Sequence, residues 1–500
     1  MTVKRVAKRQ IAIRSNRRIA MASAGAKRGR TANASPTKQF FVDMLVRDIE
    51  LKDTILDLLD NCVDGILRSV NPDLKKRTPY RGYRADIVVS GDQFIIEDNC
   101  GGIPIKIAEK SAFAIGKPDP IKGADAIATV GMYGIGMKRA IFKIGTDATV
   151  DSWNDDAFRV RITPSWLRAE DWKRLPMLRL PPGVLTKGRT RIVIERLNPA
   201  VKAEFESEYF ARDLREEIAR NYALIMDKGF AVTVRTSSDQ PVPDAIDPNE
   251  FKLLRKRGLA EDQDGIAPYL YVGELDGVQI EIYAGLYREL PSEEEREREE
   301  ETRGSTDDAG WTVACNDRVI VWKDRTRLTG WGEGSVPNYH GQFIAITGLV
   351  LLKSANPELL PLTTTKRGID GTSSLYSKVK DLMKEATKGL TTFTNKWKKF
   401  EEGLEALYQG SEYISLADLR ASLKRAPMRA THKFSTVRRF APKLPVPAAE
   451  KTKSRVSFVA LKSHLSTLAI AYFDDVAVKP AEVGEEAFRR EVALYQEAAE

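Results

Sequence analysis

The sequence predicts an α+β protein, because it contains both a segment with helical periodicity and separate segments of strand character. Residues 55–68, ILDLLDNCVDGILR, separate into an apolar and an acidic arc when projected as a helix at about 100° per residue. Residues 85–97, ADIVVSGDQFIIE, and residues 310–324, GWTVACNDRVIVWKD, carry strand-like apolar runs around turn signals. A chain of 500 residues with 42% hydrophobic residues has room for roughly two to four domains.

The helix predicted over residues 55–68 carries Asp57, Asp60, Asn61 and Asp64 on its acidic arc. The simplest interpretation is an ordinary surface helix whose carboxylates are solvated. Two glycine motifs downstream favour a functional interpretation instead.

The first motif is IIEDNCGGIP at residues 95–104, where a predicted strand ends at Asp98 and paired glycines follow. A turn alone would explain it. The second is VGMYGIGMKRAIFKIG at residues 130–145, in which three glycines precede a helical stretch. Glycines at that spacing let backbone N–H groups approach a phosphate chain, and the N-terminus of the helix adds a favourable dipole. Either motif is weak evidence by itself, but the order of helix, first motif and second motif is specific.

In this order of motifs, roughly residues 35–370 resemble the GHKL ATPases, the superfamily of gyrase B, Hsp90, histidine kinases and MutL. The resemblance is closest to the MORC, MutL and Hsp90-like members. It implies a Bergerat-type α/β sandwich that binds ATP with Mg²⁺, followed by an S5-like α/β transducer domain. Helical patterns beyond these domains predict a helical C-terminal region.

The resemblance also implies roles for single residues. Asp57 would orient the attacking water, Asn61 would coordinate Mg²⁺, and Asp98 would accept a hydrogen bond from the adenine amino group. Thr190, at the start of a strand in GRTRIVIERL, would support adenine recognition, and Gly102 would let the nucleotide approach. The other residues expected to contact the nucleotide or to cover its phosphates are Asp64, Ile103, Gly131, Gly134, Ile135, Gly136, Met137 and Lys138.

Three positions depart from the family pattern. Asp57 stands where most hydrolysing members have glutamate, and the shorter side chain retracts the carboxylate by about 1.5 Å. Because a misplacement of about 1 Å can cost roughly 10²-fold in rate, we expect slow hydrolysis. Cys100 stands where the family has the first glycine of its motif, so we expect Gly101 to take the positive-φ conformation. The match at Thr190 is looser, because Arg189 separates it from the preceding glycine.

A further motif places Lys366 after a threonine run in ITGLVLLKSANPELLPLTTTKRGID, residues 346–370. Gyrase, MutL and MORC proteins carry a lysine at the comparable place in the transducer domain, where it reaches the γ-phosphate. By this resemblance Lys366 would stabilise the charge that develops during hydrolysis and couple hydrolysis to domain movement. The alternative is a solvated lysine in a surface loop.

Basic residues are concentrated in two segments. The first 30 residues contain ten Lys or Arg and no acidic residue, and residues 420–455 contain eleven basic residues, one acid and four prolines. Both segments are predicted to be disordered and suit sequence-independent contact with DNA or another nucleic-acid backbone. The alternatives are a transit peptide or a true start at Met21 for the first segment, and a solvated linker for the second.

Composition and spacing argue against several classes of protein. No run approaches the about 18 apolar residues that span a bilayer, so no membrane role is expected. Cys62, Cys100 and Cys315 lack metal-ligand spacing, which predicts a reducing cytoplasm. The three histidines, at positions 340, 432 and 464, form no cluster that would support metal chemistry.

The domain organisation follows from these segments. We expect a basic disordered tail at residues 1–34, an ATP-binding domain at 35–199, a transducer domain at 200–372 with an acidic insertion near 291–304, a long helical segment at 373–412, a basic proline-containing linker at 413–455, and short C-terminal helices at 456–500. The strand-like segments FAVTVRT and VQIEIYAGL are both assigned to the transducer domain.

The expected function is an ATP-dependent conformational switch, in which two protomers close as a homodimer over Mg-ATP and reopen after slow hydrolysis. By analogy with MORC and MutL proteins, DNA is the expected client, in bacterial defence or DNA maintenance. The alternative is an Hsp90-like chaperone or scaffold, or an ATPase subunit that works through a protein partner or effector subunit. A histidine-kinase-type enzyme is less favoured, because no histidine occupies a convincing phosphoacceptor helix.

Overall fold

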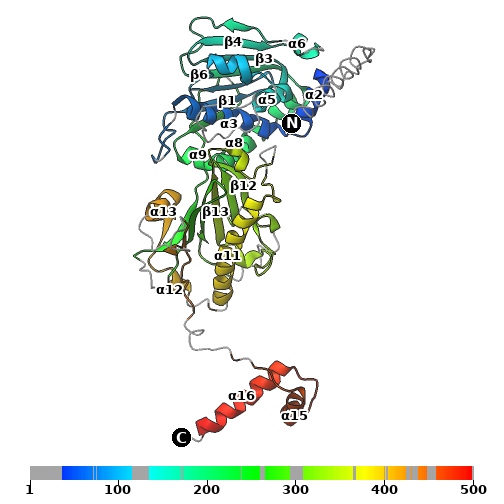
Figure 1. The fold of residues 1–500 in the computed structure, drawn as a ribbon, viewed down its shortest axis with the longest axis vertical. Helices are drawn as coiled ribbons and strands as arrows, with labels where there is room; N and C mark the ends of the chain where they lie inside the picture. The colour runs from blue at the N-terminus through cyan, green and yellow to red at the C-terminus, as the bar shows by residue number, and fades with distance from the viewer. Residues whose placement is uncertain are drawn as a thin grey trace, which may run out of the picture.

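The structure, a computed structural model, describes residues 37–497 apart from residues 71, 75, 115–134, 170–171, 173, 238, 259–264, 293–294, 296–307, 364–367, 399, 401–403, 424–428, 431–436, 448–455 and 457. Within the described residues, two seven-stranded sheets with helices packed against them dominate the fold (Figure 1). The predicted α+β class is confirmed. The N-terminal tail, most of the acidic insertion, Gly131, Gly134 and Lys366 lie outside the described residues.

The first sheet has the strand order β5-β4-β3-β6-β2-β1-β7, and β1 and β7 are parallel while the other pairs are antiparallel. Its strands are β1 (Arg84–Val89), β2 (Gln93–Asp98), β3 (Gly145–Trp153), β4 (Ala157–Ile162), β5 (Met177–Arg179), β6 (Arg189–Leu197) and β7 (Ala231–Arg235). Helices α3 (Leu51–Val70), α5 (Gly136–Ile144) and α8 (Phe210–Asn221) share one hydrophobic core with this sheet. The other helices of this half are α2 (Lys38–Arg47), α4 (Ile105–Ile107), the π-helix η1 (Ala108–Ala112), α6 (Pro164–Arg168), α7 (Pro199–Phe205) and α9 (Ala223–Asp227).

Strand β7 corrects one prediction. We assigned FAVTVRT to the transducer domain, but this segment forms β7 and pairs with β1 in the first sheet. The register places Val232 beside Ala85 and Val234 beside Ile87, and all four side chains are fully buried. The first sheet therefore includes the chain as far as residue 235, because β7 adds two apolar residues to its core.

Helix α3 forms over the predicted amphipathic segment and is more buried than an ordinary surface helix. Ile55 and Leu59 are fully buried in the core of the first sheet. Asp57, Asp60 and Asp64 are also buried, with 7%, 2% and 7% of their surface exposed. The acidic arc of α3 is therefore covered by other parts of the protein, and its charges need partners.

The second sheet has the strand order β12-β11-β13-β10-β9-β16-β15. Its strands are β9 (Tyr269–Leu275), β10 (Val278–Leu286), β11 (Gly310–Cys315), β12 (Arg318–Asp324), β13 (Ile346–Lys353), β15 (Arg429–Ala430) and β16 (Arg438–Phe440), and a separate small sheet pairs β8 (Lys252–Lys256) with β14 (Ser411–Ser415). Helix α11 (Ser374–Trp397) packs on the second sheet, and Trp311 Nε1 donates to Thr387 Oγ1 at 3.0 Å. The shorter helices here are η2 (Arg327–Thr329), η3 (Gly341–Phe343), η4 (Pro357–Leu359), α12 (Leu404–Tyr408) and α13 (Leu416–Leu423).

The hairpin of β11 and β12 turns at Asn316 and Asp317, so the predicted turn is confirmed. Both residues have positive φ, 48° and 66°, as a type I′ turn requires, and Asn and Asp tolerate this conformation. Figure 1 shows β12 next to α8 and α9 of the first half of the molecule, and these elements are in contact. The hairpin thus brings the second sheet into contact with helices that pack against the first sheet.

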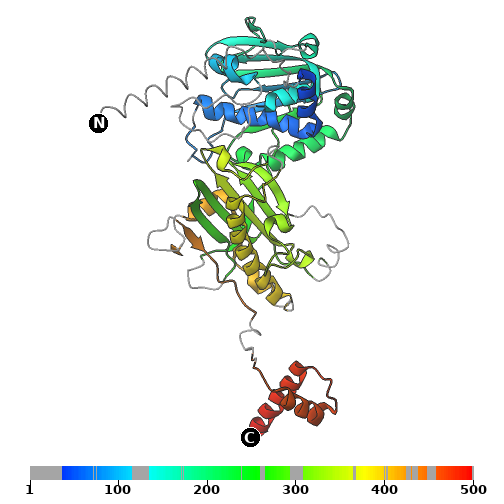
Figure 2. The same cartoon turned by 45° about the vertical axis from the view of Figure 1, so that its right-hand side comes forward.

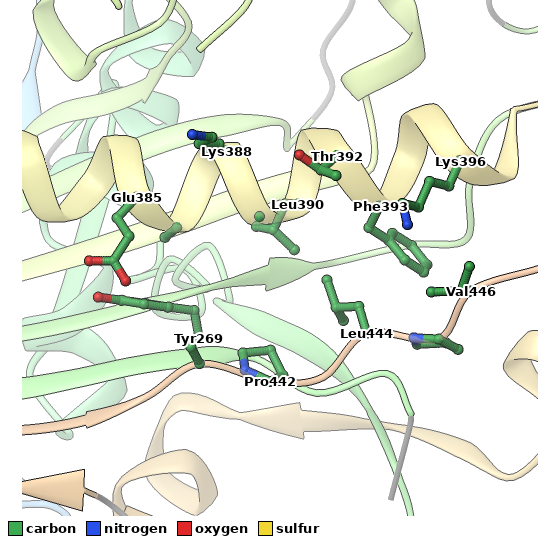
Figure 3. Close-up of a pocket in the computed structure, with 14 residues that line it drawn as sticks. Tyr269, Glu385, Lys388, Leu390, Thr392, Phe393, Lys396, Pro442, Leu444 and Val446 are labelled. Atoms are coloured by element: carbon green, nitrogen blue, oxygen red, sulfur yellow. The ribbon is translucent and has the colours of Figure 1, made fainter. Parts of the chain in front are cut away.

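Part of residues 420–455, which we predict to be disordered, has regular structure. Within this segment β16 pairs with β9, and just before it β14 pairs with β8. Arg420 of α13 forms an ion pair with Glu281, with 2.8 Å between Nε and Oε2. Farther along, a cavity of about 430 Å³ lies between α11 and residues 441–446 (Figure 3). The prediction of disorder from basic composition is wrong for these described residues, because strand pairing and ion pairs offset the repulsion between the charges.

Helices α15 (Lys462–Phe473) and α16 (Pro480–Glu497) pack against each other, and Figures 1 and 2 show them apart from both sheets. Ala469 and Val483 are buried between them, whereas Phe488 and Tyr495 are 63% and 72% exposed. Among the residues that the structure describes, no helix has both the length and the apolar character to cross a bilayer.

Two helical glycines give a matched test of how closely the β2 loop packs on α3. A Cβ at Gly65 would lie 2.8 Å from the backbone oxygen of Cys100, whereas a Cβ at Gly389 of α11 would meet no atom within 4 Å. We expect Gly65→Ala to lower the free energy of unfolding by about 1–3 kcal/mol through overpacking. Gly389→Ala should raise it by up to about 1 kcal/mol through helix propensity. Chemical denaturation measures both, and equal stabilisation by the two variants would contradict the close packing.

Candidate functional site

A row of polar side chains crosses three neighbouring strands of the first sheet. Asp98 at the end of β2 lies opposite Thr190 of β6, and Thr190 lies opposite Ser152 of β3. The hydroxyl groups of Thr190 and Ser152 are hydrogen bonded at 3.0 Å. We expect Asp98 and Thr190 to lie together, and the register pairs them. Ser152 could not be predicted, since nothing in the sequence alone shows which residue of β3 faces Thr190.

Asp98 is held in a buried pocket of hydrogen-bond donors. Its side chain is 9% exposed, Oδ1 accepts from the backbone N–H of Cys100 at 2.7 Å, and Oδ2 accepts from the thiol of Cys62 at 3.5 Å. Burial raises the pKa of Asp98 to about 6, although the hydrogen bond from Cys100 works in the opposite direction. Cys62 belongs to α3, so this contact ties the carboxylate to the helix that carries Asp57 and Asn61.

The loop after β2 is fixed between α3 and β3 by its glycines. Gly101 has φ +103° and Gly102 has φ +71°, so the expected positive-φ conformation of Gly101 is confirmed. A Cβ at Gly101 would lie 2.5 Å from Ser69 Cβ on α3, and a Cβ at Gly102 would lie 2.5 Å from the backbone oxygen of Trp153 on β3. Cys100 itself is buried, and its side chain occupies the position beside α3.

Asp57 on α3 is paired with an arginine that we did not predict as a site residue. Arg139 of α5 donates from Nε to Asp57 Oδ2 at 3.1 Å, and its Nη2 bonds the same oxygen. Both side chains are less than one tenth exposed. A Cβ at Gly136, the first residue of α5, would lie 3.3 Å from Asp57 Cβ, so the glycine lets the start of α5 approach the carboxylate. Asn61 is exposed one turn later, and its Nδ2 donates to the backbone oxygen of Asp57 at 2.9 Å.

A comparison with protein-family models matches residues 49–170 to the histidine kinase-, DNA gyrase B-, and HSP90-like ATPase family. These residues form a GHKL ATPase domain. The matched segment contains α3, the loop after β2, and α5, which carry most of the described site. No curated protein matches the chain significantly.

Within the GHKL ATPase domain, the remaining expected residues differ in how they lie. Lys138 is buried, its Nζ donates to the backbone oxygen of Ala112 at 3.0 Å, and burial lowers its pKa to about 8. Met137 packs in the core of the first sheet, while Ile135 and Ile103 are half-buried. The backbone N–H of Ile103 donates to Ser152 Oγ at 2.8 Å, which links the glycine loop to the polar row.

The donor groups of the GHKL ATPase domain fit Mg²⁺ bound together with a nucleotide. The described residues contain no group of three or more His, Cys, Asp or Glu side chains arranged to hold a metal by themselves. Mg²⁺ does not need such a group, because it keeps several waters and takes one or two protein oxygens together with substrate phosphates. The exposed amide of Asn61, one turn from the carboxylate of Asp57, offers an oxygen of that kind.

The raised pKa of Asp98 predicts a pH-dependent stability. The folded chain holds a proton on this group at pH values between the ordinary pKa of 3.8 and about 6, where the unfolded chain has lost it. The unfolding free energy should therefore fall as the pH rises from about 4 to about 6, by on the order of 2–3 kcal/mol from this group. Asp98→Asn should remove this part of the slope. Denaturation of both proteins at several pH values measures it, and identical slopes would contradict the assignment.

Proposed function

We propose that this protein is a Mg²⁺-dependent ATPase that works as a slow conformational switch. The observation that carries the proposal is the arrangement along α3. This helix presents Asp57 and Asn61 on consecutive turns and contacts Asp98 through Cys62. The proposed water-orienting carboxylate and the proposed metal-binding amide therefore lie on one helix, and this helix contacts the proposed adenine-binding carboxylate at the end of β2.

The roles of the residues follow from their chemistry. Asp98, supported by Thr190 and Ser152, accepts the hydrogen bond from the adenine amino group. Asn61 would hold Mg²⁺, which would supply positive charge beside the phosphates. Asp57 accepts a hydrogen bond from the attacking water and orients it. Turnover is slow for two reasons: the aspartate is short by one methylene, and Arg139 already occupies Asp57 Oδ2.

The second sheet is proposed to act as a transducer domain, with Lys366 as the residue that senses the γ-phosphate. Lys366 lies outside the described residues. The residues that flank its segment are held together, since Leu362 pairs with Ile369 and the backbone N–H of Thr363 donates to the oxygen of Gly368 at 3.1 Å. In this proposal ATP binding closes two protomers into a homodimer, and loss of the γ-phosphate releases Lys366 and reopens them.

DNA is the client that we favour, because the two basic segments suit a phosphate backbone. The alternative client is a protein, as for an Hsp90-like chaperone or an ATPase subunit. One observation favours it: Phe488, Val492 and Tyr495 follow helical spacing on α16 and are 63%, 37% and 72% exposed. A histidine-kinase-type function has less support, although His464 is exposed on α15.

Steady-state Mg-ATP hydrolysis tests the proposal and separates the two clients. We expect slow turnover by the purified chain, a rise with duplex DNA at low salt, and loss of that rise at moderate salt as counterion release weakens binding. Turnover that DNA does not change would instead support a protein client. A chain that does not hydrolyse Mg-ATP under any of these conditions would contradict the ATPase proposal.

Three variants serve as controls in the same assay. Asp57→Asn should keep nucleotide binding but stop turnover, and Asn61→Ala should abolish Mg-ATP binding or turnover. Asp57→Glu restores the length that most hydrolysing members have and should raise the rate severalfold if the short side chain limits it. Unchanged hydrolysis in Asn61→Ala would refute the metal assignment.

A further inference from the structure

The tip of the β11–β12 hairpin inserts a buried arginine into the half of the molecule that holds the ATP site. Arg318 is the first residue of β12, directly after the type I′ turn at Asn316 and Asp317. Its side chain is only 8% exposed, although a guanidinium keeps its charge. A buried permanent charge costs free energy unless it is paired and hydrogen bonded. The partners of Arg318 therefore indicate which part of the molecule this residue stabilises.

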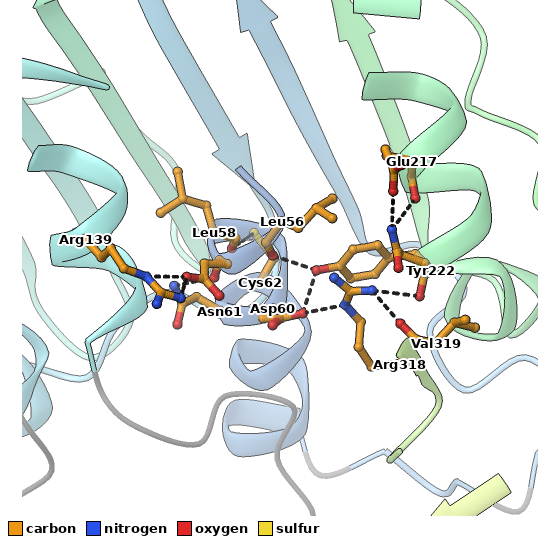
Figure 4. A network of polar contacts seen from close by, with 12 residues as sticks. Leu56, Leu58, Asp60, Asn61, Cys62, Arg139, Glu217, Tyr222, Arg318 and Val319 are labelled. Carbon is orange, nitrogen blue, oxygen red and sulfur yellow. Dashed lines mark hydrogen bonds and ion pairs between the residues drawn. The ribbon is translucent and has the colours of Figure 1, made fainter. Parts of the chain in front are cut away.

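Arg318 and its partners contact helix α3 (Figure 4). Arg318 Nε donates to Asp60 Oδ1 at 3.1 Å, and Nη1 donates to the backbone oxygen of Asn221 at 3.3 Å. The guanidinium carbon lies 4.5 Å from the centre of the Tyr222 ring. The hydroxyl of Tyr222 lies 2.5 Å from Asp60 Oδ1 and 2.6 Å from the backbone oxygen of Leu56. Arg318 and Tyr222 together therefore hold one turn of α3 through hydrogen bonds to Asp60 and Leu56.

That turn is the one on which the proposed chemistry depends. Asp60 directly precedes Asn61 and follows Asp57 by three residues. Figure 4 shows Arg139 approaching α3 from one side and Tyr222 and Arg318 approaching it from the other. A helix held at two sides cannot rotate about its axis or slide, and either movement would displace Asp57 and Asn61 together.

We propose that Arg318 is a positioning residue that sets the orientation of Asp57 and Asn61 through Asp60. The hairpin of the second sheet would thereby control the geometry of the ATP site without touching the nucleotide. This inference rests on the ATPase function proposed above. It differs from the role given to Lys366, because Arg318 acts through its contact with Asp60 on α3 and not through the γ-phosphate.

A second buried ion pair provides a matched control. Lys228, which follows α9, pairs with Asp317 of the same hairpin turn, and Lys353 Nζ lies 3.1 Å from Asp317 Oδ1. Burial lowers the pKa of Lys228 to about 8, so it too is a buried cation at the junction. This pair joins the same two parts of the chain without contacting α3. A variant that removes this ion pair therefore tests how much the attachment of the hairpin matters by itself.

The experiment compares Arg318→Met with Lys228→Met for kcat, KM and the Mg²⁺ concentration that gives half-maximal activity. We expect Arg318→Met to lower kcat or raise the Mg²⁺ requirement by about 10–100-fold, the usual cost of removing a residue that orients a ligand. Lys228→Met should leave both quantities nearly unchanged, since Lys353 still pairs with Asp317. Equal effects of the two variants would overturn the inference, because only attachment of the hairpin would then matter.

Asp60→Asn combined with Arg318→Met tests whether the effect passes through Asp60. The double variant should lose little more activity than the more impaired single variant, whereas additive losses would overturn the inference. If Arg318→Met does not fold, Arg318→Lys keeps the charge, loses the planar contact with Tyr222, and should still reduce kcat. If the unmodified chain hydrolyses ATP and these variants hydrolyse it at the same rate, only the inference about Arg318 is overturned. Absence of hydrolysis in the unmodified chain overturns the proposed function instead.

Discussion

The buried carboxylates on α3 need positively charged partners, and this requirement constrains how the neighbouring elements are arranged. Asp57 and Asp60 are almost inaccessible to solvent, and an isolated buried carboxylate costs several kcal/mol. Each therefore takes an arginine from a different element, Arg139 from α5 and Arg318 from β12. The start of α5 is thereby fixed beside Asp57, and the hairpin of the second sheet is fixed beside Asp60. The ion pairs that neutralise Asp57 and Asp60 thus position α3 and connect it to the hairpin of the second sheet.

The loop after β2, which leads away from Asp98, depends on a different constraint, the close approach of its backbone to α3. Gly65 lets the oxygen of Cys100 reach α3, and Gly101 and Gly102 let the loop pass between α3 and β3. Cys100 replaces a glycine of the family pattern without opening this loop, because its side chain is buried beside α3. The carboxylate of Asp98 is then placed by two contacts, from Cys100 and from Cys62. The departure from the family pattern is accommodated within the packing of the site.

Sequence reasoning succeeded where a signal is local. The periodicity of residues 55–68 predicted α3, the Asn-Asp pair predicted the turn of β11 and β12, and the motif order predicted the GHKL ATPase domain that the family comparison supports. It failed where the answer depends on residues far apart in the chain. Arg139 and Asp57 are 82 residues apart, and Arg318 and Asp60 are 258 apart, so no spacing rule connects them.

The same limit explains the errors of strand assignment. Nothing in FAVTVRT shows that it pairs in parallel with β1, since the partner is chosen by the buried face that β1 already offers. Residues 411–415 and 438–440 form strands only because β8 and β9 provide edges in register. Ser152 is of the same kind, because its role follows from its place opposite Thr190. The roles given to the site residues are predictions, and Gly131, Gly134 and Lys366 lie outside the described residues.

The central claim is that α3 and the end of β2 form a Mg²⁺-dependent site for an adenine nucleotide. Calorimetric titration of the purified chain with ATP and with GTP, each with Mg²⁺ and with a chelator, tests it most directly. The account predicts that ATP binds, that Mg²⁺ strengthens the binding, and that GTP binds much more weakly, because guanine presents a carbonyl oxygen where Asp98 needs a donor. Absence of ATP binding, or equal binding of ATP and GTP, would contradict it.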